Sequence, residues 1–481
     1  MNNEKKQTRF RISSEFSSGL KKKQIKAESE SNVGKILSVP QHTNRLGRVM
    51  TPVEAERKNR LLYGNISISN RVQAQRSKRL KARRTFSDAP APKPLNVSTN
   101  GISGIWHYVK KTVIAHIRKI DFVLLILIVI LASFGIIAVH SGSMNEFAHR
   151  RIDFLQIASF AIGLFGVLLL PAFDISTLFE KWKLVYIINV GLLVVTLLFG
   201  YSPTGEENNS WINLGFTSIQ PAEFSKVLFI ISLSAHLEKI KDSINKLSSM
   251  AGVLLHGFSI IGLVLAEKDW GNTLVFIVIF VTMVFCAGIN LRYIFGCIAL
   301  AVAAFPIIWD NLGEFRKRRV LIGFNPELDP QGYGHQVIRS RNAISSGGLF
   351  GQGYLQGETI HTDGALFAQH TDMVYAVIGQ EFGFVGCALL IAVYVFLVSR
   401  ILYIAGKAKD YSGSYICCGV AGMLIFQFII NIGMALGISP VVGITLPLVS
   451  YGASSLIAMY SALALVMAVY GNSNSYSYRS I

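Results

Sequence analysis

The chain has 481 residues, of which 51% are hydrophobic and only 15% are charged. A soluble domain carries about a quarter charged residues, so this composition excludes an ordinary soluble protein. The net charge of +18 lies in one place: residues 1–119 hold 26 Lys and Arg against 7 Asp and Glu, whereas residues 120–481 hold 20 against 21. A basic tail on a nearly neutral, apolar body excludes a basic globular nucleic-acid binder and indicates a membrane protein.

The N-terminal segment, residues 1–118, is rich in Lys, Arg, Ser, Asn and Gln and contains an Ala-Pro-Ala-Pro-Lys-Pro run at 89–94. It cannot bury enough apolar area to offset the entropy of ordering, so we expect a disordered cytosolic tail. Its basic residues would be attracted to the anionic inner leaflet, by about 1 kcal/mol each near the surface. A merely solvated linker is the alternative.

Apolar runs then follow one another along a membrane domain at 119–472, and a short C-terminus occupies 473–481. Each run is near or above the roughly 17 residues that a helix needs to cross a bilayer. The sequence therefore predicts an all-α polytopic membrane protein with about ten transmembrane helices. The runs lie at 122–139, 154–171, 184–200, 220–237, 250–266, 272–289, 294–309, 373–398, 414–437 and 443–470.

Basic residues in the short loops predict the orientation, because cytoplasmic loops carry an excess of Lys and Arg. With the N-terminus inside, the inner short loops hold nine such residues and the outer ones three. We therefore expect both termini in the cytosol. Residues 310–372, between spans seven and eight, then form a large extracytoplasmic loop, and a connection of this length is usually functional.

Ionisable residues occur at membrane depth. Glu223 and Lys226 follow Pro221 at the start of one span, three residues apart, so they share a helix face and can neutralise each other. Such a pair either sets the depth of the helix or lines a groove for a charged head group. Asp269, at another helix boundary, is expected to cap the helix that follows.

Asp372 stands at the junction of the large loop and the next span. Its position before Met373 is typical of a helix N-cap. The alternative is a catalytic carboxylate at the membrane surface, because the same loop contains the cationic run 316–319, which could hold a phosphate. Both interpretations remain open from the local pattern.

The cysteines do not indicate a metal site or a disulfide framework. All lie in or beside apolar runs, without a CxxC pair and without a His at metal-ligand spacing. Buried apolar thiols are the simplest interpretation. They are Cys286, Cys297, Cys387, Cys417 and Cys418.

Several motifs, in order along about 120–470, resemble those of the SEDS family (RodA, FtsW and the sporulation member SpoVE). The run 343–351 (AISSGGLFG) is similar to the family's AIGSGGLFG, and His370-Thr371-Asp372 matches its HTD. Further similar segments are Trp211–Gly215 (RWI-x-LG), Gln220–Lys226 (QPSE-x-x-K), Glu267–Gly271 (QPDLG), Arg319–Pro326 with Gly332–Gln336 and Ser340 (the opening of the outer loop), Glu381–Phe384 (EELG), Pro440–Ile444 (PVTG) and Leu446–Ser455 (PLPF-x-SYGGSS).

This resemblance implies a peptidoglycan glycosyltransferase that polymerises lipid II at the outer face of the cytoplasmic membrane, for cell shape, division or sporulation, together with a class B penicillin-binding protein. Asp372 would be its catalytic base, removing a proton from the acceptor 4-hydroxyl. Arg319 and its neighbours, or a divalent cation such as Mg²⁺, would stabilise the charge that develops on the pyrophosphate leaving group. The implied substrate-binding residues are Arg319, Gln336, Ser340, Glu223, Lys226, Ser450 and Tyr451.

The chain departs from the family pattern at four places. Phe367-Ala368-Gln369 stands where the family has Leu-Pro-Glu before HTD, and Ser210 stands where RWI has its Arg; the others are Arg339, in place of a Gln, and Gln380, in place of the first Glu of EELG. Two alternative functions therefore stay open: a lipid II flippase that uses the Glu223/Lys226 pair, and a non-catalytic scaffold for a penicillin-binding protein.

Overall fold

The computed structural model describes residues 116–202, 208–215, 218–311, 313–362 and 368–477. The predicted tail lies outside these residues except for 116–118. The described part is built from helices and one short hairpin, β1 (Ile212–Asn213) with β2 (Ser218–Ile219), in which Ile212 pairs with Ile219. The expected all-α polytopic fold is confirmed.

The helices follow one another along the chain, with the longest connections after α7, α13 and α15. Their bounds are α4 (Phe122–Ser143), α5 (His149–Leu169), η1 (Leu170–Ala172), α6 (Ser176–Glu180), α7 (Trp182–Phe199), α8 (Pro221–Ile240), α9 (Leu247–Ala266), α10 (Trp270–Cys286), α11 (Leu291–Asn311), α12 (Glu314–Phe324), η2 (Pro326–Leu328), α13 (Tyr333–Ser346), α14 (Val374–Lys407), α15 (Tyr411–Leu436) and α16 (Ala453–Ser477).

Among the described residues, seven helices are long and apolar enough to cross a membrane: α4, α5 with η1, α7, α9, α14, α15 and α16. The helix α8 is also 20 residues long but carries Glu223, Lys226, Glu238 and Lys239. The apolar helix α10 and the apolar stretch Leu291–Ile307 of α11 are shorter. The count of ten spans therefore stays a prediction. Nine of the predicted runs fall largely on helices of the structure. The start of the last run, 443–470, is wrong, because 443–452 is a non-helical connection and α16 begins only at Ala453.

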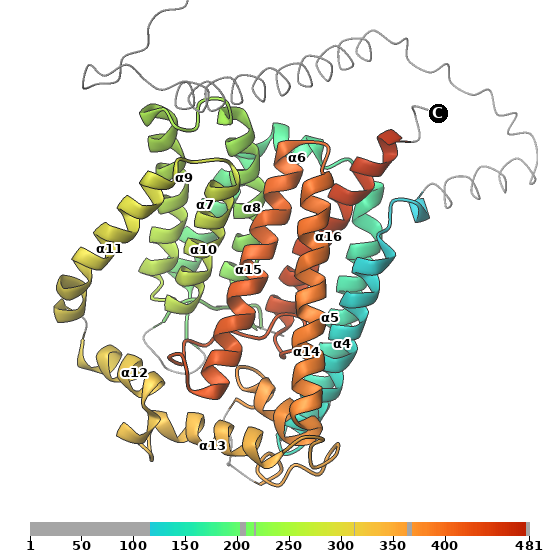
Figure 1. Ribbon diagram of the computed structural model, residues 1–481, viewed down its shortest axis with the longest axis vertical. Helices are drawn as coiled ribbons and strands as arrows, with labels where there is room; N and C mark the ends of the chain where they lie inside the picture. Colours follow the sequence, from blue (N-terminus) through green and yellow to red (C-terminus); the bar gives the residue numbers. More distant parts are fainter. Residues whose placement is uncertain (1–115, 203–207, 216–217, 312, 363–367, 478–481) are drawn as a thin grey trace, which may run out of the picture. The chain divides into compact units, whose positions relative to one another are not determined.

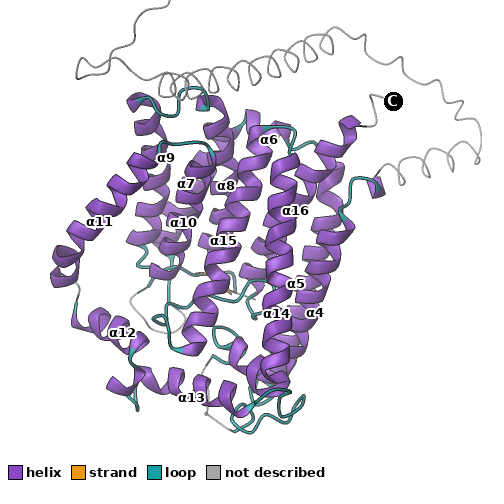
Figure 2. Cartoon of the chain, viewed as in Figure 1, coloured by secondary structure: helices purple, strands orange, loops and turns teal. Residues whose placement is uncertain are grey.

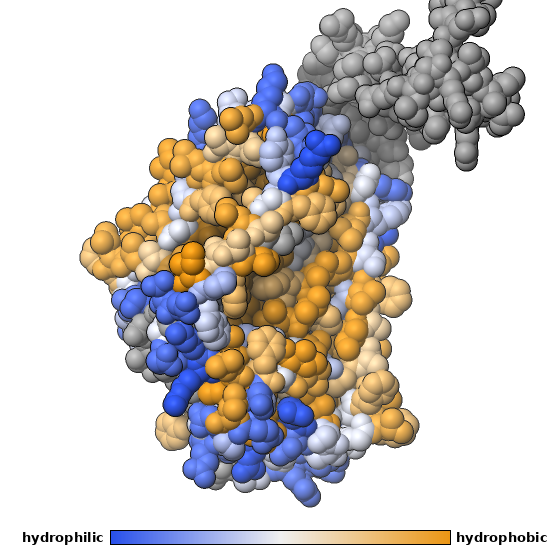
Figure 3. All heavy atoms as spheres, turned by 60° about the vertical axis from the view of Figure 1, so that its left-hand side comes forward, coloured by the Kyte–Doolittle hydropathy of each residue, from blue (hydrophilic) through white to orange (hydrophobic). Residues whose placement is uncertain are grey.

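The long helices stand side by side and bury one continuous apolar core (Figures 1 and 2). The helix α15 packs against α14, α10 and α8, while α16 packs against α5. Seen from the side that carries α11, an apolar belt separates two hydrophilic ends and is hollowed near its middle (Figure 3). This distribution is the one a protein needs to sit in a bilayer.

The segment 310–372 is more ordered than a plain connection. It contains α12, η2 and α13, and Figure 1 shows α12 and α13 lying across one end of the upright helices. We call this the α12/α13 end. The preceding helix α11 slants away from its neighbours, and its large apolar side chains stay exposed, Leu300 at 71%. An exposed apolar helix of this kind faces lipid.

The thiols differ in part from the expectation. Cys387, Cys417 and Cys418 are buried as predicted, but Cys286 and Cys297 are exposed, so the prediction is wrong for these two. Cys286 is the last residue of α10, and Cys297 lies on α11, whose apolar side chains are largely exposed. All five cysteines are free thiols.

Candidate active site at the α12/α13 end

Asp372 lies in the turn that leads into α14, and its carboxylate faces the connection between α15 and α16. A Cβ added at Gly443 would be 3.7 Å from Asp372 Oδ2, and Gly443 itself has a φ of +69°. A side chain there would be strained, and its Cβ would be in van der Waals contact with the carboxylate. The glycine therefore brings the connection beside the acid with no side chain between them.

The capping interpretation of Asp372 is wrong. The helix α14 begins at Val374, and Met373 occupies the N-cap position without a side-chain hydrogen bond. The helix begins one residue later than the sequence pattern suggested, because Met373 N bonds back to Ala368 O at 3.2 Å and closes a turn first. By contrast, the predicted cap at Asp269 is confirmed: its Oδ1 accepts from Asn272 N at 3.0 Å.

The backbone of Asp372 is fixed by a side chain of α15. Asn431 Nδ2 donates to Asp372 O at 2.9 Å and to Ile444 O at 2.8 Å. Asn431 is fully buried. One amide group thus joins the turn that carries the acid to the connection that carries Gly443.

Ser450 and Tyr451 lie beside Asp372, but they bind its backbone neighbours. Ser450 Oγ donates to Thr371 O at 2.5 Å and accepts from Leu446 N at 2.9 Å. Tyr451 N donates to His370 O at 2.9 Å. That both residues bind substrate stays a prediction; these contacts join both of them to the His370–Asp372 turn.

The connection 437–444 brings three further helices toward Asp372. A Cβ on Gly323 of α12 would lie 2.2 Å from Pro440 Cα, and one on Gly271 of α10 would lie 2.5 Å from Val442 O. Ser340 of α13 is buried, and its Oγ donates to Ala435 O at 2.7 Å, at the end of α15. The packed glycines allow backbone to approach backbone, so α10, α12 and α13 meet at one connection.

The predicted cations lie on α12. The backbone of Arg319 belongs to this helix, but its side chain is outside the described part of the chain. Arg318 is exposed, and Lys317 Nζ lies 3.4 Å from Glu314 Oε1. Gln336 is half-buried on α13. The structure thus places α12 against the connection that faces Asp372 without fixing a distance from Arg319 to the acid.

The predicted pair of Glu223 and Lys226 forms, with 2.8 Å between Oε2 and Nζ, and Lys226 is 1% exposed. Lys226 Nζ also donates to Asn272 Oδ1 at 3.0 Å. Asn272 Nδ2 in turn donates to Asp269 Oδ2 at 2.9 Å, and that oxygen also accepts from Gln220 Nε2 at 2.7 Å. This polar chain joins the starts of α8 and α10, and its burial favours a structural role for the ion pair over direct contact with a head group.

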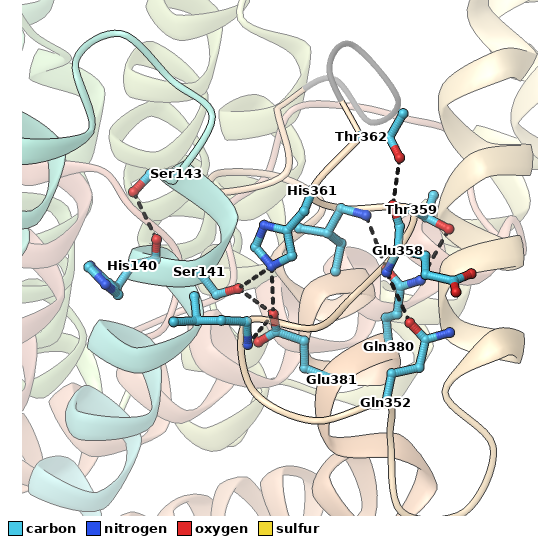
Figure 4. Close-up of polar contacts among 12 residues, drawn as sticks. His140, Ser141, Ser143, Gln352, Glu358, Thr359, His361, Thr362, Gln380 and Glu381 are labelled. Carbon is cyan, nitrogen blue, oxygen red and sulfur yellow. Dashed lines mark hydrogen bonds and ion pairs between the residues drawn. The ribbon is translucent and has the colours of Figure 1, made fainter.

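A second polar cluster ties the loop after α13 to α14 (Figure 4). Glu381 is 1% exposed. Its Oε1 accepts hydrogen bonds from Leu355 N, at 3.1 Å, and from Ser141 Oγ, and it lies 3.1 Å from His361 Nε2. The neighbouring Gln380 accepts from Ile360 N at 3.1 Å. Two side chains of α14 therefore hold residues 355–361 in place.

Backbone strain gathers in the same region. The non-glycine residues with positive φ in the described chain are Lys268 (60°), Leu355 (62°), Ala368 (55°) and Leu448 (63°). Ala368 and Leu448 lie in the segments on either side of the His370–Asp372 turn, Leu355 lies in the loop held by Glu381, and Lys268 lies in the turn before α10. Such residues cost of order 1–3 kcal/mol each and cluster where function requires a fixed geometry.

Two titratable groups near these turns are shifted by burial. Burial lowers the pKa of His370, partly offset by Glu146, so the imidazole beside Asp372 is neutral at neutral pH. Burial, with the nearby Asp269 carboxylate, raises the pKa of Glu267 to about 8. Within the described residues, no group of three or more His, Cys, Asp or Glu could hold a metal ion.

Three of these features were absent from the sequence predictions: Asn431, Asn272 and the Glu381–His361 contact. Asn431 and Asn272 are isolated amides in otherwise apolar spans, which is a usable signal because polar groups in membrane helices are costly and usually retained for a purpose. The partner of each amide, however, lies far away in the sequence.

Comparison with known proteins assigns the family. Residues 122–475 match the model of the FtsW/RodA/SpoVE family, described as cell cycle protein. The chain belongs to this family. Among FtsW/RodA/SpoVE relatives, it is 32% identical over 363 residues to a probable peptidoglycan glycosyltransferase FtsW of Trichlorobacter lovleyi, covering 73% of this chain and 93% of the relative. It is also 32% identical over 354 residues to the peptidoglycan glycosyltransferase MrdB of Escherichia coli K12, with the same coverage.

Solved FtsW/RodA structures share the fold. A chain from a peptidoglycan synthase complex, studied for its coordination of polymerization and crosslinking, matches with a TM-score of 0.65 at 30% identity, covering 74% of this chain and 98% of that chain. The rod shape determining protein RodA of Thermus thermophilus matches with a TM-score of 0.55 at 29% identity, covering 73% and 96%. The resemblance inferred from the motifs is thus confirmed at the level of family and fold.

Proposed function

We propose that this member of the FtsW/RodA/SpoVE family is a peptidoglycan glycosyltransferase that polymerises lipid II, with Asp372 as the general base. The match covers 93% of the length of each of two relatives named peptidoglycan glycosyltransferases, which supports the same activity here. The observation that carries the assignment of the base is the placement of the Asp372 carboxylate against Gly443, at a turn fixed by Asn431.

The chemistry fits this turn. Forming the glycosidic bond requires removal of a proton from the acceptor 4-hydroxyl, which a positioned carboxylate can accept. The bond to the lipid pyrophosphate breaks in the same step, and the developing charge needs cations nearby. The basic residues of α12 are candidates, because α12 packs on the connection that faces Asp372. A divalent cation would supply the same stabilisation.

The orientation and the lipid tail follow from the same proposal. The excess of Lys and Arg in the opposite loops supports an α12/α13 end outside the cell. The hollow in the apolar belt beside the exposed face of α11 offers a lipid-facing place for a polyprenyl chain (Figure 3). Head-group chemistry would then occur at the surface, next to Asp372. A class B penicillin-binding protein is the proposed partner, supported by the similar chain from a peptidoglycan synthase complex.

The test is polymerisation by the purified full-length protein with its partner penicillin-binding protein and lipid II. We expect Asp372→Ala and Asp372→Asn to abolish glycan strands, because neither side chain can accept the proton. Glu327→Gln is the matched control, since Glu327 is an exposed acid of the same segment. Normal strands from Asp372→Asn would refute the assignment of the base.

The flippase alternative has less support. A transporter places its charged groups near the bilayer midplane and lines a path with them. Glu223 and Lys226 instead lie in the first turns of α8, and both are bonded inside the bundle. Translocation of labelled lipid II that depends on Lys226 and survives Asp372→Asn would favour the flippase over the glycosyltransferase.

A further inference from the structure

Four buried oxygen atoms near the start of α10 have no hydrogen-bond partner among the described residues. They are both carboxylate oxygens of Glu267, Asn208 Oδ1 and Ser210 Oγ. Glu267 is 1% exposed and Ser210 is fully buried. A buried polar group without a partner costs about 1–3 kcal/mol, and an ionised carboxylate costs more.

These oxygens belong to two stretches of chain that lie against each other. Asn209 N donates to Glu267 O at 3.2 Å, and the next residues continue into the bridge between Trp211 and Tyr201. In extended chain, alternate side chains point to the same side. The burial follows this alternation, because Asn209 is exposed while Ser210 is buried and Asn208 is half-buried. Asn208 and Ser210 therefore face the interior beside Glu267.

The charges around these atoms favour a cation. Asp269, two residues from Glu267, adds a second carboxylate, which is already bonded to Asn272 and Gln220 and so contributes charge but no unused oxygen. The family motifs carry an Arg where this chain has Ser210 and a Gln where it has Glu267. Relative to those motifs, this neighbourhood has lost a positive side chain and gained a second carboxyl group.

We propose that Glu267, Ser210 and Asn208 form a binding site for a hard divalent cation, Ca²⁺ or Mg²⁺. Carboxylate, amide and hydroxyl oxygens are the ligands such ions prefer. The ion joins the segment after α7 to the turn between α9 and α10, and it neutralises the excess carboxylate charge beside Asp269. The site is separate from the proposed base: it is linked to Asp372 through Gly271, which packs on Val442, the neighbour of Gly443.

The experiment uses the full-length protein in detergent after removal of metals, and it does not depend on polymerisation. Tb³⁺ is the first probe, since Trp211 and Trp270 flank the site in the sequence and can sensitise its emission. We expect saturable emission that excess Ca²⁺ or Mg²⁺ displaces; the more effective ion identifies the natural ligand. The same ion should raise the melting temperature.

Glu267→Gln keeps the shape of the side chain and removes its charge. We expect it to weaken Tb³⁺ binding at least tenfold and to abolish the melting shift, while Glu327→Gln behaves as wild type. Without metal, Glu267→Gln should melt at or above wild type; if it instead melts lower, Ser210→Ala provides the second test and should weaken binding several-fold. The proposal is overturned if wild type gives no saturable emission, or if neither variant weakens it. Either result leaves the assignment of Asp372 untouched.

Discussion

The side-chain amide of Asn431 holds two backbone oxygens at once, that of Asp372 at 2.9 Å and that of Ile444 at 2.8 Å. The two oxygens belong to the turn before α14 and to the connection after α15. Their separation is therefore set by a single planar group on a third element. Because Gly443 precedes Ile444, the same group also helps to set how closely the Asp372 carboxylate approaches Gly443.

Asn431→Leu should reduce polymerisation through the position of Asp372. Leu fills a similar volume but donates no hydrogen bond, so both oxygens lose their donor and the turn shifts. A displacement of about 1 Å at a reacting group can cost about 100-fold in rate. We expect kcat to fall about 10- to 100-fold with little change in KM, measured in the lipid II polymerisation assay.

Gln427→Leu is the control for this variant. Gln427 lies one turn earlier on α15 and is also buried, and its Oε1 has no partner within the described structure. Removing it should leave kcat unchanged, since no turn depends on it. An equal fall in kcat in the two variants, or a change in KM alone, would contradict a positioning role for Asn431.

The ion pair of Glu223 and Lys226 should matter for stability. Lys226→Met leaves the Glu223 carboxylate buried without its counter-charge, a change that typically costs about 3–5 kcal/mol. The double variant Glu223→Gln with Lys226→Met removes both charges and should recover most of that loss. Thermal unfolding of wild type, the two single variants and the double variant measures the coupling energy between the two charges.

The exposed pair of Glu314 and Lys317 is a matched control, since it has the same spacing on a helix but a 3.4 Å separation, with Glu314 84% exposed. An exposed pair contributes about 0.2–1 kcal/mol, so Lys317→Met should change the melting temperature little. If Lys226→Met were equally mild, the polar chain from Gln220 to Lys226 would have no structural role.

These comparisons also show what the sequence could predict. The Glu223–Lys226 pair and the cap at Asp269 follow from spacings of three residues within one helix, where local geometry decides the contact. The contacts of Asn431 with Asp372 and of Ser340 with Ala435 join residues 59 and 95 positions apart. Only the packing of α13, α14 and α15 creates them.

The start of α14 shows a similar limit. Asp372 has the sequence pattern of an N-cap, but the turn closed by Met373 and Ala368 moves the helix start by one residue. Motif resemblance predicted the opposite role for the same residue, because it carries information about the whole site that helix-capping rules lack. The family and the helical membrane fold were predictable; the supports of the site were not.

Gly383 should prove necessary for docking the loop after α13. It interrupts α14 with φ 66° and ψ −164°, and a Cβ there would lie 2.3 Å from Gly351 N and 2.7 Å from Leu349 O. Just beyond it, Phe384 N and Val385 N donate to Gly348 O and Leu349 O at 2.9 and 3.1 Å. The break in the helix frees these donors for the loop.

Gly383→Ala therefore meets both an unfavourable φ and a backbone clash, and it should weaken the docking by at least about 1–3 kcal/mol. Amide hydrogen exchange should then be faster in 347–353, while the melting temperature falls modestly. Gly406→Ala, in the last turn of the same helix, is the control, because nothing lies within 4 Å of its added Cβ. Unchanged exchange in 347–353 of Gly383→Ala would mean that the loop is held without the helix break, by the contacts of Gln380 and Glu381 alone.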